Sequence, residues 1–282
     1  MHELTPLEQL SAQEGGNELP LPPTLVALYG PFSLPVHTGR PYVISNFVTT
    51  LDGVVALNDP AHPSGGDISG SNTHDRVVMG LLRAVADAVI VGAGTLRAVP
   101  THRWTAEYIY PSLSSAYQQL RTTMGKAASP LNVIVTASGA IDLSQPLFQS
   151  NEVPVLLVTT PHGAHRIALQ NPPPMTRVSV VEHTDTITAR EILQAVQNVL
   201  PARIILVEGG PQLMGNFLAE QCLDELFLTL APQIAGRTSA TERPGFVSGT
   251  LFAPDHPLWS RLISIRRAES YLFLRYRFAS DE

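Results

Sequence analysis

The stretch Arg203-Ile-Ile-Leu-Val-Glu-Gly-Gly-Pro-Gln-Leu-Met-Gly215 reads as a buried strand that turns directly into a helix. The unbroken apolar run at residues 204–207 is typical of a strand that is covered on both faces. The pair Gly209-Gly210 allows a tight turn and close approach of a ligand, and Pro211 suits the first position of a helix. In open α/β sheets, ligands bind at the carboxyl ends of strands, where a helix N-terminus also attracts anions. We therefore expect a phosphate-bearing ligand at this turn, with Glu208 beside it.

The same architecture of strand, glycine turn and helix occurs earlier in the chain. A short apolar strand at residues 88–91 is followed by Gly92-Ala-Gly94-Thr95. A lone Gly-x-Gly is a weak signal, and no third glycine completes the dinucleotide-binding fingerprint at its usual place. It is the repetition of the architecture that favours a second ligand-binding turn here.

Further segments complete an α/β pattern. Apolar runs predict additional strands at Tyr42–Thr49, Leu131–Ala137, Val153–Thr160, Arg177–Val181 and Leu223–Ala231. Helical spacing and capping predict helices at Asn72–Ala86, at Ser114–Met124 and from the capping box at Thr188 to Leu200. Period-two alternation around Ala268-Glu269 predicts an antiparallel hairpin at a sheet edge.

Residues 1–40 are rich in proline, glycine and polar residues, and we expect an N-terminal extension with at most a short helix near Pro6–Gln13. A set of apolar residues is expected to hold part of it on the surface: Leu25, Val26, Leu28, Tyr29 and Phe32. Residues 41–282 are then expected to form one domain, because no second boundary is evident. The loops at 58–71 and 232–258 are rich in glycine, proline and serine, and long loops such as the first are often functional lids.

The composition is that of a well-cored globular protein, with 44% hydrophobic and 15% charged residues among 282. A net charge of −6 implies no general affinity for nucleic acid, and no apolar run approaches the roughly 20 residues that span a bilayer. The first residues lack a basic region followed by an apolar one, so we expect a soluble cytoplasmic protein. Cys222 is the only cysteine, and the pair His162 and His165 lacks a carboxylate, so no disulfide and no metal site is expected.

Four motifs occur in order along residues 41–278. They are Thr50-Leu-Asp-Gly53, Leu82-Arg-Ala-Val-Ala-Asp-Ala-Val-Ile-Val-Gly-Ala-Gly-Thr95, Val207-Glu-Gly-Gly-Pro211, and Asp224-Glu-Leu-Phe-Leu-Thr-Leu-Ala-Pro232 followed by Gly236. With this combination the chain resembles the reductase domain of riboflavin biosynthesis, which has the dihydrofolate-reductase-like fold. The resemblance implies a mostly parallel central sheet flanked by helices, with an antiparallel C-terminal hairpin. It also implies a homodimeric, NADPH-dependent enzyme that reduces the ribosyl group of a 5-amino-6-ribosylamino-pyrimidine to a ribityl group.

The resemblance assigns residues to the cofactor. The pyrophosphate and nicotinamide of NADPH would lie on Gly92, Gly94, Thr95, Gly209, Gly210 and Leu213. Thr136 and Ser138, which follow a predicted strand, would lie near the adenosine ribose or its 2′-phosphate.

The resemblance also assigns residues to a small-molecule substrate. Thr50, Arg83 and Arg103 would contact it, with Arg83 a candidate for its phosphate group. The predicted helix alone favours a solvated Arg83, because this residue lies off the apolar stripe. Asp52 and Glu208 would be the catalytic residues, and either could supply the proton that accompanies hydride transfer if burial raises its pKa.

The substrate half departs from the family pattern in two places. The segment Thr95-Leu-Arg-Ala-Val-Pro100 lacks the carboxylate that the family's reductases carry near Ala98-Val99, and Val54 stands where a lysine is common. Two alternatives therefore stay open: a dihydrofolate or pterin reductase of the same fold, and a non-catalytic NADPH-binding protein. A zinc deaminase domain precedes the reductase in many bacteria and needs a Cys-x-x-Cys pair, so with one cysteine we expect none here.

Overall fold

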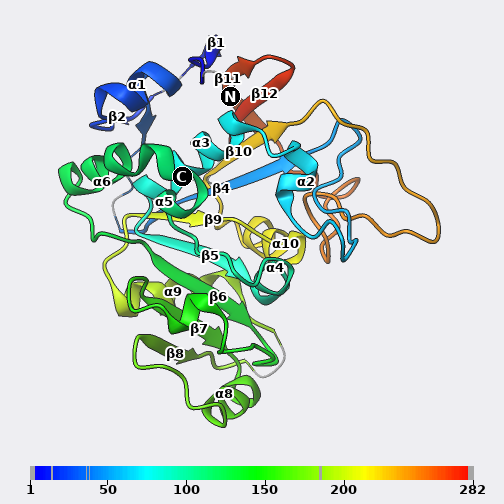
Figure 1. The fold of residues 1–282 in the computed structure, drawn as a ribbon. Helices are drawn as coiled ribbons and strands as arrows, with labels where there is room; N and C mark the ends of the chain where they lie inside the picture. Colours follow the sequence, from blue (N-terminus) through cyan, green and yellow to red (C-terminus); the bar gives the residue numbers. More distant parts are fainter. Residues whose placement is uncertain (1–3, 14, 36, 38, 184–185, 279–282) are drawn as a thin grey trace.

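The computed structural model describes residues 4–13, 15–35, 37, 39–183 and 186–278. Its centre is a ten-stranded sheet in the order β1-β11-β12-β10-β4-β9-β5-β6-β7-β8, which runs from the top to the bottom of Figure 1. These strands are β1 Glu8–Ala12, β4 Tyr42–Thr49, β5 Ala88–Gly92, β6 Leu131–Thr136, β7 Val155–Thr159, β8 Thr176–Val180, β9 Ile204–Val207, β10 Glu225–Leu230, β11 Ser260–Ala268 and β12 Tyr271–Phe278. A separate small sheet pairs β2 Asn17–Glu18 with β3 Ser33–Leu34.

Neighbouring strands from β10 to β8 are all parallel, whereas β1, β11 and β12 join by antiparallel pairing. The predicted α/β class, the mostly parallel sheet and the antiparallel C-terminal hairpin are therefore confirmed. Since parallel strands end at the same edge, the turns after β4, β9, β5 and β6 all meet at what we call the carboxyl edge.

Helices cover both faces of this sheet. They are α1 Pro23–Tyr29, α2 Gly65–Ser69, α3 Thr73–Val85, α4 Ala93–Ala98, α5 Ala106–Ile109, the 3-10 turn η1 Pro111–Leu113, α6 Ser114–Thr123, α7 Pro146–Gln149, α8 Pro161–Ala168, α9 Ala189–Val199 and α10 Pro211–Ala219. The predicted helices at 72–86, 114–124 and 188–200 correspond to α3, α6 and α9, and the Thr188 capping box is present. Helix α4 is the helix that the repeated architecture predicted after the second glycine turn, whereas the short helices α2, α5, α7 and α8 were not predicted.

Alternation along β9 assigns its side chains to two separate cores. Ile204 and Leu206 belong to the core under α3 and α6, and Ile205 and Val207 belong to the core under α9 and α10. Successive side chains of a strand point to opposite faces, so Glu208 continues on the α3 side. The register of this short strand thus decides which helix the motif carboxylate meets.

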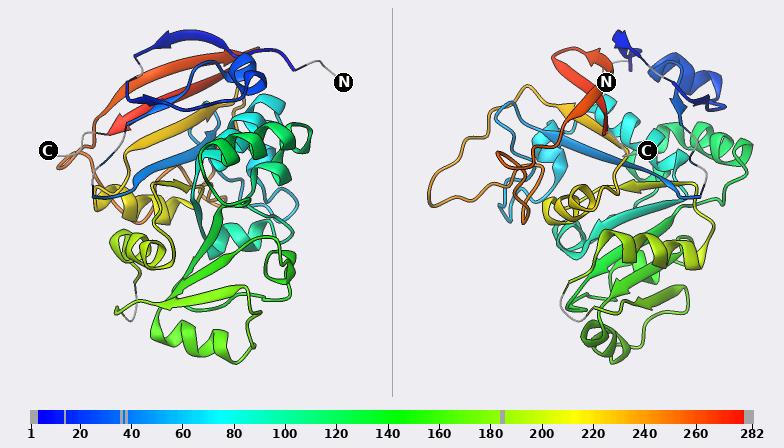
Figure 2. Two further views of the ribbon diagram at one scale, coloured as in Figure 1. Left: turned by 90° about the vertical axis from the view of Figure 1, so that its left-hand side faces the viewer. Right: turned by 180° about the vertical axis from the view of Figure 1, so that it is seen from behind.

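The N-terminal extension differs from the expectation. No helix forms near Pro6–Gln13; instead β1 pairs with β11, and the helix is α1, which starts at Pro23. Figure 2 shows β1 lying along β11, so β1 and not the C-terminal hairpin forms that edge of the sheet. Pairing supplies partners for the backbone groups that β11 would otherwise expose, which outweighs a marginal isolated helix. The residues Leu25, Tyr29 and Phe32 are buried as predicted, whereas Val26 is exposed.

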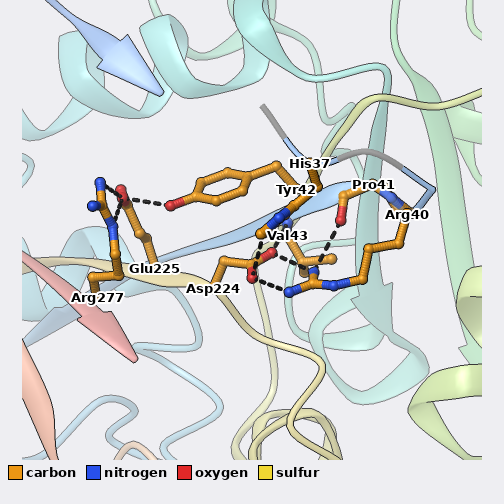
Figure 3. Close-up of polar contacts among 8 residues, drawn as sticks. All are labelled: His37, Arg40, Pro41, Tyr42, Val43, Asp224, Glu225 and Arg277. Atoms are coloured by element: carbon orange, nitrogen blue, oxygen red, sulfur yellow. Dashed lines mark hydrogen bonds and ion pairs between the residues drawn. The ribbon is translucent and has the colours of Figure 1, made fainter. Parts of the chain in front are cut away.

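The acidic pair of the Asp224 motif lies at the amino ends of β4 and β10. Asp224 accepts hydrogen bonds from Arg40 Nη2 at 2.6 Å and from the Val43 backbone N–H at 2.7 Å (Figure 3). Glu225 is fully buried and accepts from Tyr42 Oη at 2.6 Å, and Arg277 also binds it. These contacts hold the two strands in register. The Asp224-Glu225 part of the motif therefore has a structural role, far from the carboxyl edge.

Among the described residues, no helix is long and apolar enough to cross a membrane.

Candidate active site

The two glycine turns meet at the carboxyl edge. The Gly92 N–H donates to the Gly209 carbonyl at 2.9 Å, which joins the ends of β5 and β9. Thr95 Oγ1 lies 3.0 Å from where a Cβ on Gly209 would sit, and 3.6 Å from that position on Gly210. Gly209 also has a φ of +137°, a conformation that favours glycine. Two motifs that are far apart in the sequence therefore form one surface, and side chains at Gly209 would obstruct it.

This surface suits the pyrophosphate of a dinucleotide. Helix α10 begins at Pro211 behind Gly210, and no side chain caps its N-terminus. Leu213 is buried in its first turn, so the helix is held against the core below the turn. A cradle without Cβ atoms beside an uncapped helix N-terminus is the arrangement that binds phosphate groups.

The turn after β6 lies next to these glycines, because Gly92 pairs with Val135 of β6. Thr136 is buried and its Oγ1 accepts from the Gly139 N–H at 3.1 Å, so this hydroxyl shapes the loop. Ser138 is exposed on the same loop. Of the two hydroxyl residues, Ser138 is the one placed to meet a ligand directly.

Glu208 and Arg83 form a buried ion pair. Arg83 Nη2 lies 2.7 Å from Glu208 Oε2, with side chains 2% and 5% exposed. Arg83 Nε also donates to both carboxylate oxygens at 3.0 Å, and Nη1 donates to the Thr105 carbonyl at 3.2 Å. The expectation of a solvated Arg83 is therefore wrong, because its charge is neutralised by a carboxylate 125 residues away in the chain.

Asp52 holds a loop. Its carboxylate accepts from Thr50 Oγ1 at 2.5 Å and from the backbone N–H groups of Ala235 and Gly236 at 3.1 and 2.8 Å. These hydrogen bonds, with Thr50 the strongest, lower the pKa of Asp52 to about 2. The rise in pKa that a proton donor needs is not found, so at neutral pH Asp52 is an anion that ties the loop after β10 to the turn after β4.

Replacing Asp52 with alanine should loosen that loop. Trypsin should then cut after Arg237 at least several times faster, because Ala235 and Gly236 lose their acceptor. The matched control is Asp142→Ala, which removes a similar exposed carboxylate that binds Ser144 elsewhere. Limited proteolysis read by mass spectrometry checks this; equal cutting rates in both variants would show that Asp52 does not anchor the loop.

Arg103 does not join the other predicted site residues. Its Nη1 pairs with Glu152 Oε2 at 2.9 Å, and Glu152 precedes β7. The next residue, Trp104, donates its backbone N–H to the Asn132 side chain at the start of β6. Arg103 therefore lies at the amino edge of the sheet, opposite the glycine turns.

A buried acid was missed by the sequence analysis. Asp75, in the first turn of α3, is 4% exposed. Burial raises its pKa to about 6, hydrogen bonds from Thr229 and Ser69 oppose the rise, and the charge of Glu208 adds to it. The signal in the sequence was its spacing from Val78 and Leu82, which puts a carboxylate on the apolar stripe of α3.

A buried hydrogen-bond acceptor, the side-chain oxygen of Asn46, also lies near Glu208. Asn46 is 6% exposed, and its Oδ1 has no hydrogen-bond partner among the described residues. It follows Ser45, which pairs with Val207 of β9, so it adjoins Glu208 in the sheet. Buried polar atoms are nearly always bonded, and an unbonded one beside Glu208 is a place for a ligand or water.

A cavity of about 1540 Å³ opens at the other edge of the sheet. It is lined by the residues that start the strands, including Tyr42, Leu131 and Ile204, and by none of the two glycine turns. Two of its cations are paired with carboxylates, Lys126 with Asp87 at 2.5 Å and Arg40 with Asp224 at 2.6 Å. Size alone would favour this cavity, but the glycine turns, the uncapped helix and the buried acid lie at the carboxyl edge, and we place the site there.

The chain is similar to known proteins in sequence and in fold. A family model described as the RibD C-terminal domain matches residues 41–267. The 2,5-diamino-6-ribosylamino-4(3H)-pyrimidinone 5′-phosphate reductase of Archaeoglobus fulgidus is 27% identical over 205 residues, which are 72% of this chain and 85% of that protein. The riboflavin biosynthesis protein RibD of Aquifex aeolicus is 23% identical over 70% of this chain, which spans 48% of that protein. The crystal structure of a pyrimidine reductase-like protein from Corynebacterium diphtheriae shares the fold, with a TM-score of 0.67, 20% identity and coverage of 92% of this chain and 99% of that one.

Proposed function

The chain belongs to the RibD C-terminal domain family, and on that premise we propose that it is an NADPH-dependent reductase of a ribosylamino-pyrimidine in riboflavin biosynthesis. The observation that carries the proposal is the contact between the turns at Gly92 and Gly209, which makes one surface for a dinucleotide. The named activity of the Archaeoglobus fulgidus relative supports the choice of substrate. The product would be the ribitylamino-pyrimidine, and the enzyme would act as a homodimer.

The residues at the carboxyl edge fit the cofactor. Those that would hold its pyrophosphate and nicotinamide are Gly92, Gly94, Thr95, Gly209, Gly210 and Leu213. Ser138 would meet the adenosine ribose or its 2′-phosphate, and Thr136 would shape that loop. Bound NADPH supplies a hydride for an electrophilic carbon, and the protein contributes alignment and exclusion of water.

The reaction also needs a proton, and Asp75 is the residue that we assign to it. The carboxylate of Glu208 is occupied by Arg83 through three hydrogen bonds, and the pKa of Asp52 is lowered to about 2. Asp75 combines burial, a pKa of about 6 and proximity to Glu208. General acids work best with a pKa near the working pH, so Asp75 can be protonated when hydride arrives. Glu208 then acts by positioning Arg83 and the end of β9.

Replacing Asp75 with asparagine should remove the pH dependence that this carboxyl group gives to stability and to turnover. In the wild type its pKa rises from 3.8 to about 6 on folding, so its contribution to stability is complete below about pH 4 and is lost as the pH rises through 6. As the pH rises from 4 to 8, the wild-type free energy of unfolding should fall by on the order of 2–3 kcal/mol relative to that of the Asp75→Asn protein. Its turnover should be low at all pH values, whereas wild-type turnover falls above about pH 6.

Urea unfolding and turnover at a series of pH values check this, with the exposed Asp255→Asn as the control. If Asp75→Asn keeps the wild-type pH profile of turnover, Asp75 does not carry the proton.

The substrate test is oxidation of NADPH, with NADH as the comparison. We expect turnover with the ribosylamino-pyrimidine 5′-phosphate and little with dihydrofolate. The alternative of a pterin reductase stays open because Val99 ends α4 where the family has a carboxylate. Turnover with dihydrofolate alone would decide for that alternative. Binding of NADPH without oxidation by either substrate would replace the proposal by a non-catalytic nucleotide-binding protein. Light scattering during gel filtration measures the oligomeric state.

A further inference from the structure

The substrate of the proposed function carries a phosphate, and the two arginines first assigned to substrate do not suit that group. Arg83 is saturated by Glu208 and Thr105. Arg103 lies at the amino edge with Glu152. An anionic substrate group therefore needs other cations on the substrate half of the carboxyl edge, which we define as the ends of β4 and β10 because the glycine turns follow β9 and β5.

Two arginines meet this requirement. Within the described ranges, Arg237 and Arg243 have no carboxylate within the 4.0 Å of an ion pair. Both lie in the loop that follows β10. Arg97 is likewise without a carboxylate partner there, but it lies in α4 on the cofactor half.

Backbone carbonyls orient both guanidinium groups without neutralising them. Arg237 donates Nη1 to the Asp52 carbonyl at 2.8 Å, Nη2 to the Gly53 carbonyl at 3.1 Å and Nε to the Arg243 carbonyl at 3.1 Å. Arg243 donates Nη1 to the carbonyls of Ala235 and Gly236. The one nearby carboxylate in this network, Asp52, is bound by backbone N–H groups. Neither arginine is therefore paired with that carboxylate.

The loop carries these arginines across the carboxyl edge. The Leu51 N–H donates to the Gln233 carbonyl at 2.8 Å, and the Val55 N–H donates to the Pro244 carbonyl at 3.0 Å. Farther along, the Ser248 N–H donates to the carbonyl of Pro211, the first residue of α10, at 3.1 Å. The same loop therefore touches the turn after β4 at one end and the helix of the cofactor turn at the other.

We propose that Arg237 and Arg243 bind the phosphate monoester of the substrate. This assignment rests on the proposed function and names the anionic part of its substrate. A phosphate monoester carries about −1.5 to −2 charges at neutral pH on a compact set of oxygens. Guanidinium groups match such oxygens with paired donors, and both arginines keep donors that no carboxylate occupies. A glutamyl tail, as in folates, spreads its two carboxylates farther apart and fits two adjacent cations less well.

Calorimetric titration of the full chain with D-ribose 5-phosphate tests the proposal, with NADP⁺ saturating so that phosphate cannot occupy the cofactor turn. Wild type should bind ribose 5-phosphate in the millimolar range or tighter, and D-ribose or N-(4-aminobenzoyl)glutamate at least tenfold more weakly. Arg243→Gln and Arg237→Gln should each weaken binding of ribose 5-phosphate at least tenfold. The matched control is Arg97→Gln on the cofactor half, which should leave that affinity unchanged.

Lysine variants separate charge from loop structure. Arg243→Lys should keep ribose 5-phosphate binding within a few fold, because it keeps the charge, with an unchanged melting temperature. If the lysine variant loses as much as the glutamine variant, if Arg97→Gln loses as much, or if wild type does not bind the sugar phosphate, the proposal is overturned. Since this titration needs no turnover, a protein that binds ribose 5-phosphate through these arginines but oxidises no NADPH would contradict the proposed reaction and leave this site standing.

Discussion

Replacing Glu208 with leucine should destabilise the protein by about 3–5 kcal/mol, because it leaves Arg83 as an unpaired cation in the core. Both side chains are at most 5% exposed, and three hydrogen bonds join them. The cost comes from the desolvated charge that stays behind rather than from the net value of the pair. Urea unfolding at neutral pH measures it.

Two further variants make this result specific. The double variant Arg83→Met with Glu208→Leu removes both charges and should recover most of the loss in stability, although not activity. Breaking the exposed pair of Arg103 and Glu152, whose side chains are 35% and 79% exposed, should cost less than about 1 kcal/mol. If the Glu208→Leu protein lost no more stability than the protein with the Arg103–Glu152 pair broken, the burial of the Arg83–Glu208 pair would be contradicted.

Replacing Gly209 with alanine should lower NADPH affinity by roughly a hundredfold, the sum of backbone strain and an obstructed surface. The φ of +137° disfavours any side chain, and the new Cβ would sit 3.0 Å from Thr95 Oγ1. Fluorescence titration of NADPH measures the affinity. Gly125→Ala is the matched control, because its φ of +66° is also positive but nothing lies within 4 Å of its Cβ position. Equal NADPH affinities in the two variants would remove the Gly209 turn from the cofactor site.

Local patterns were sufficient for the regular elements. Apolar runs, unbroken in β9 at Ile204–Val207 and interrupted only by Ser45-Asn46 in β4 at Tyr42–Thr49, predicted these strands, because a buried strand needs little information beyond its own residues. The edge strand β1 could not be predicted in this way. Its residues Glu8–Ala12 are mostly polar and are held by β11, more than 240 residues later. Pairing at such a distance leaves no periodic signal in a short segment.

In the candidate site, too, local sequence predicted some features and distant contacts determined others. The glycine turns were predicted by their own composition, and the structure joins them through Gly92 and Gly209. Which acid is charged could not be predicted, because partners distant in the sequence decide it. Asp52 meets the N–H groups of Ala235 and Gly236, which lower its pKa, and Asp75 is buried, which raises its pKa. The roles of the acids therefore depend on tertiary contacts.

The most direct test of the central claim follows a labelled hydride. The full chain would be mixed with NADPH deuterated at the transferring position of C4 and with the ribosylamino-pyrimidine 5′-phosphate. Mass spectrometry and NMR would then locate the label in the product. We predict one deuterium on the carbon that joins the ribityl chain to the pyrimidine nitrogen, and its loss in the Gly209→Ala protein at the same NADPH concentration. Unlabelled substrate recovered alongside unoxidised NADPH would contradict the account.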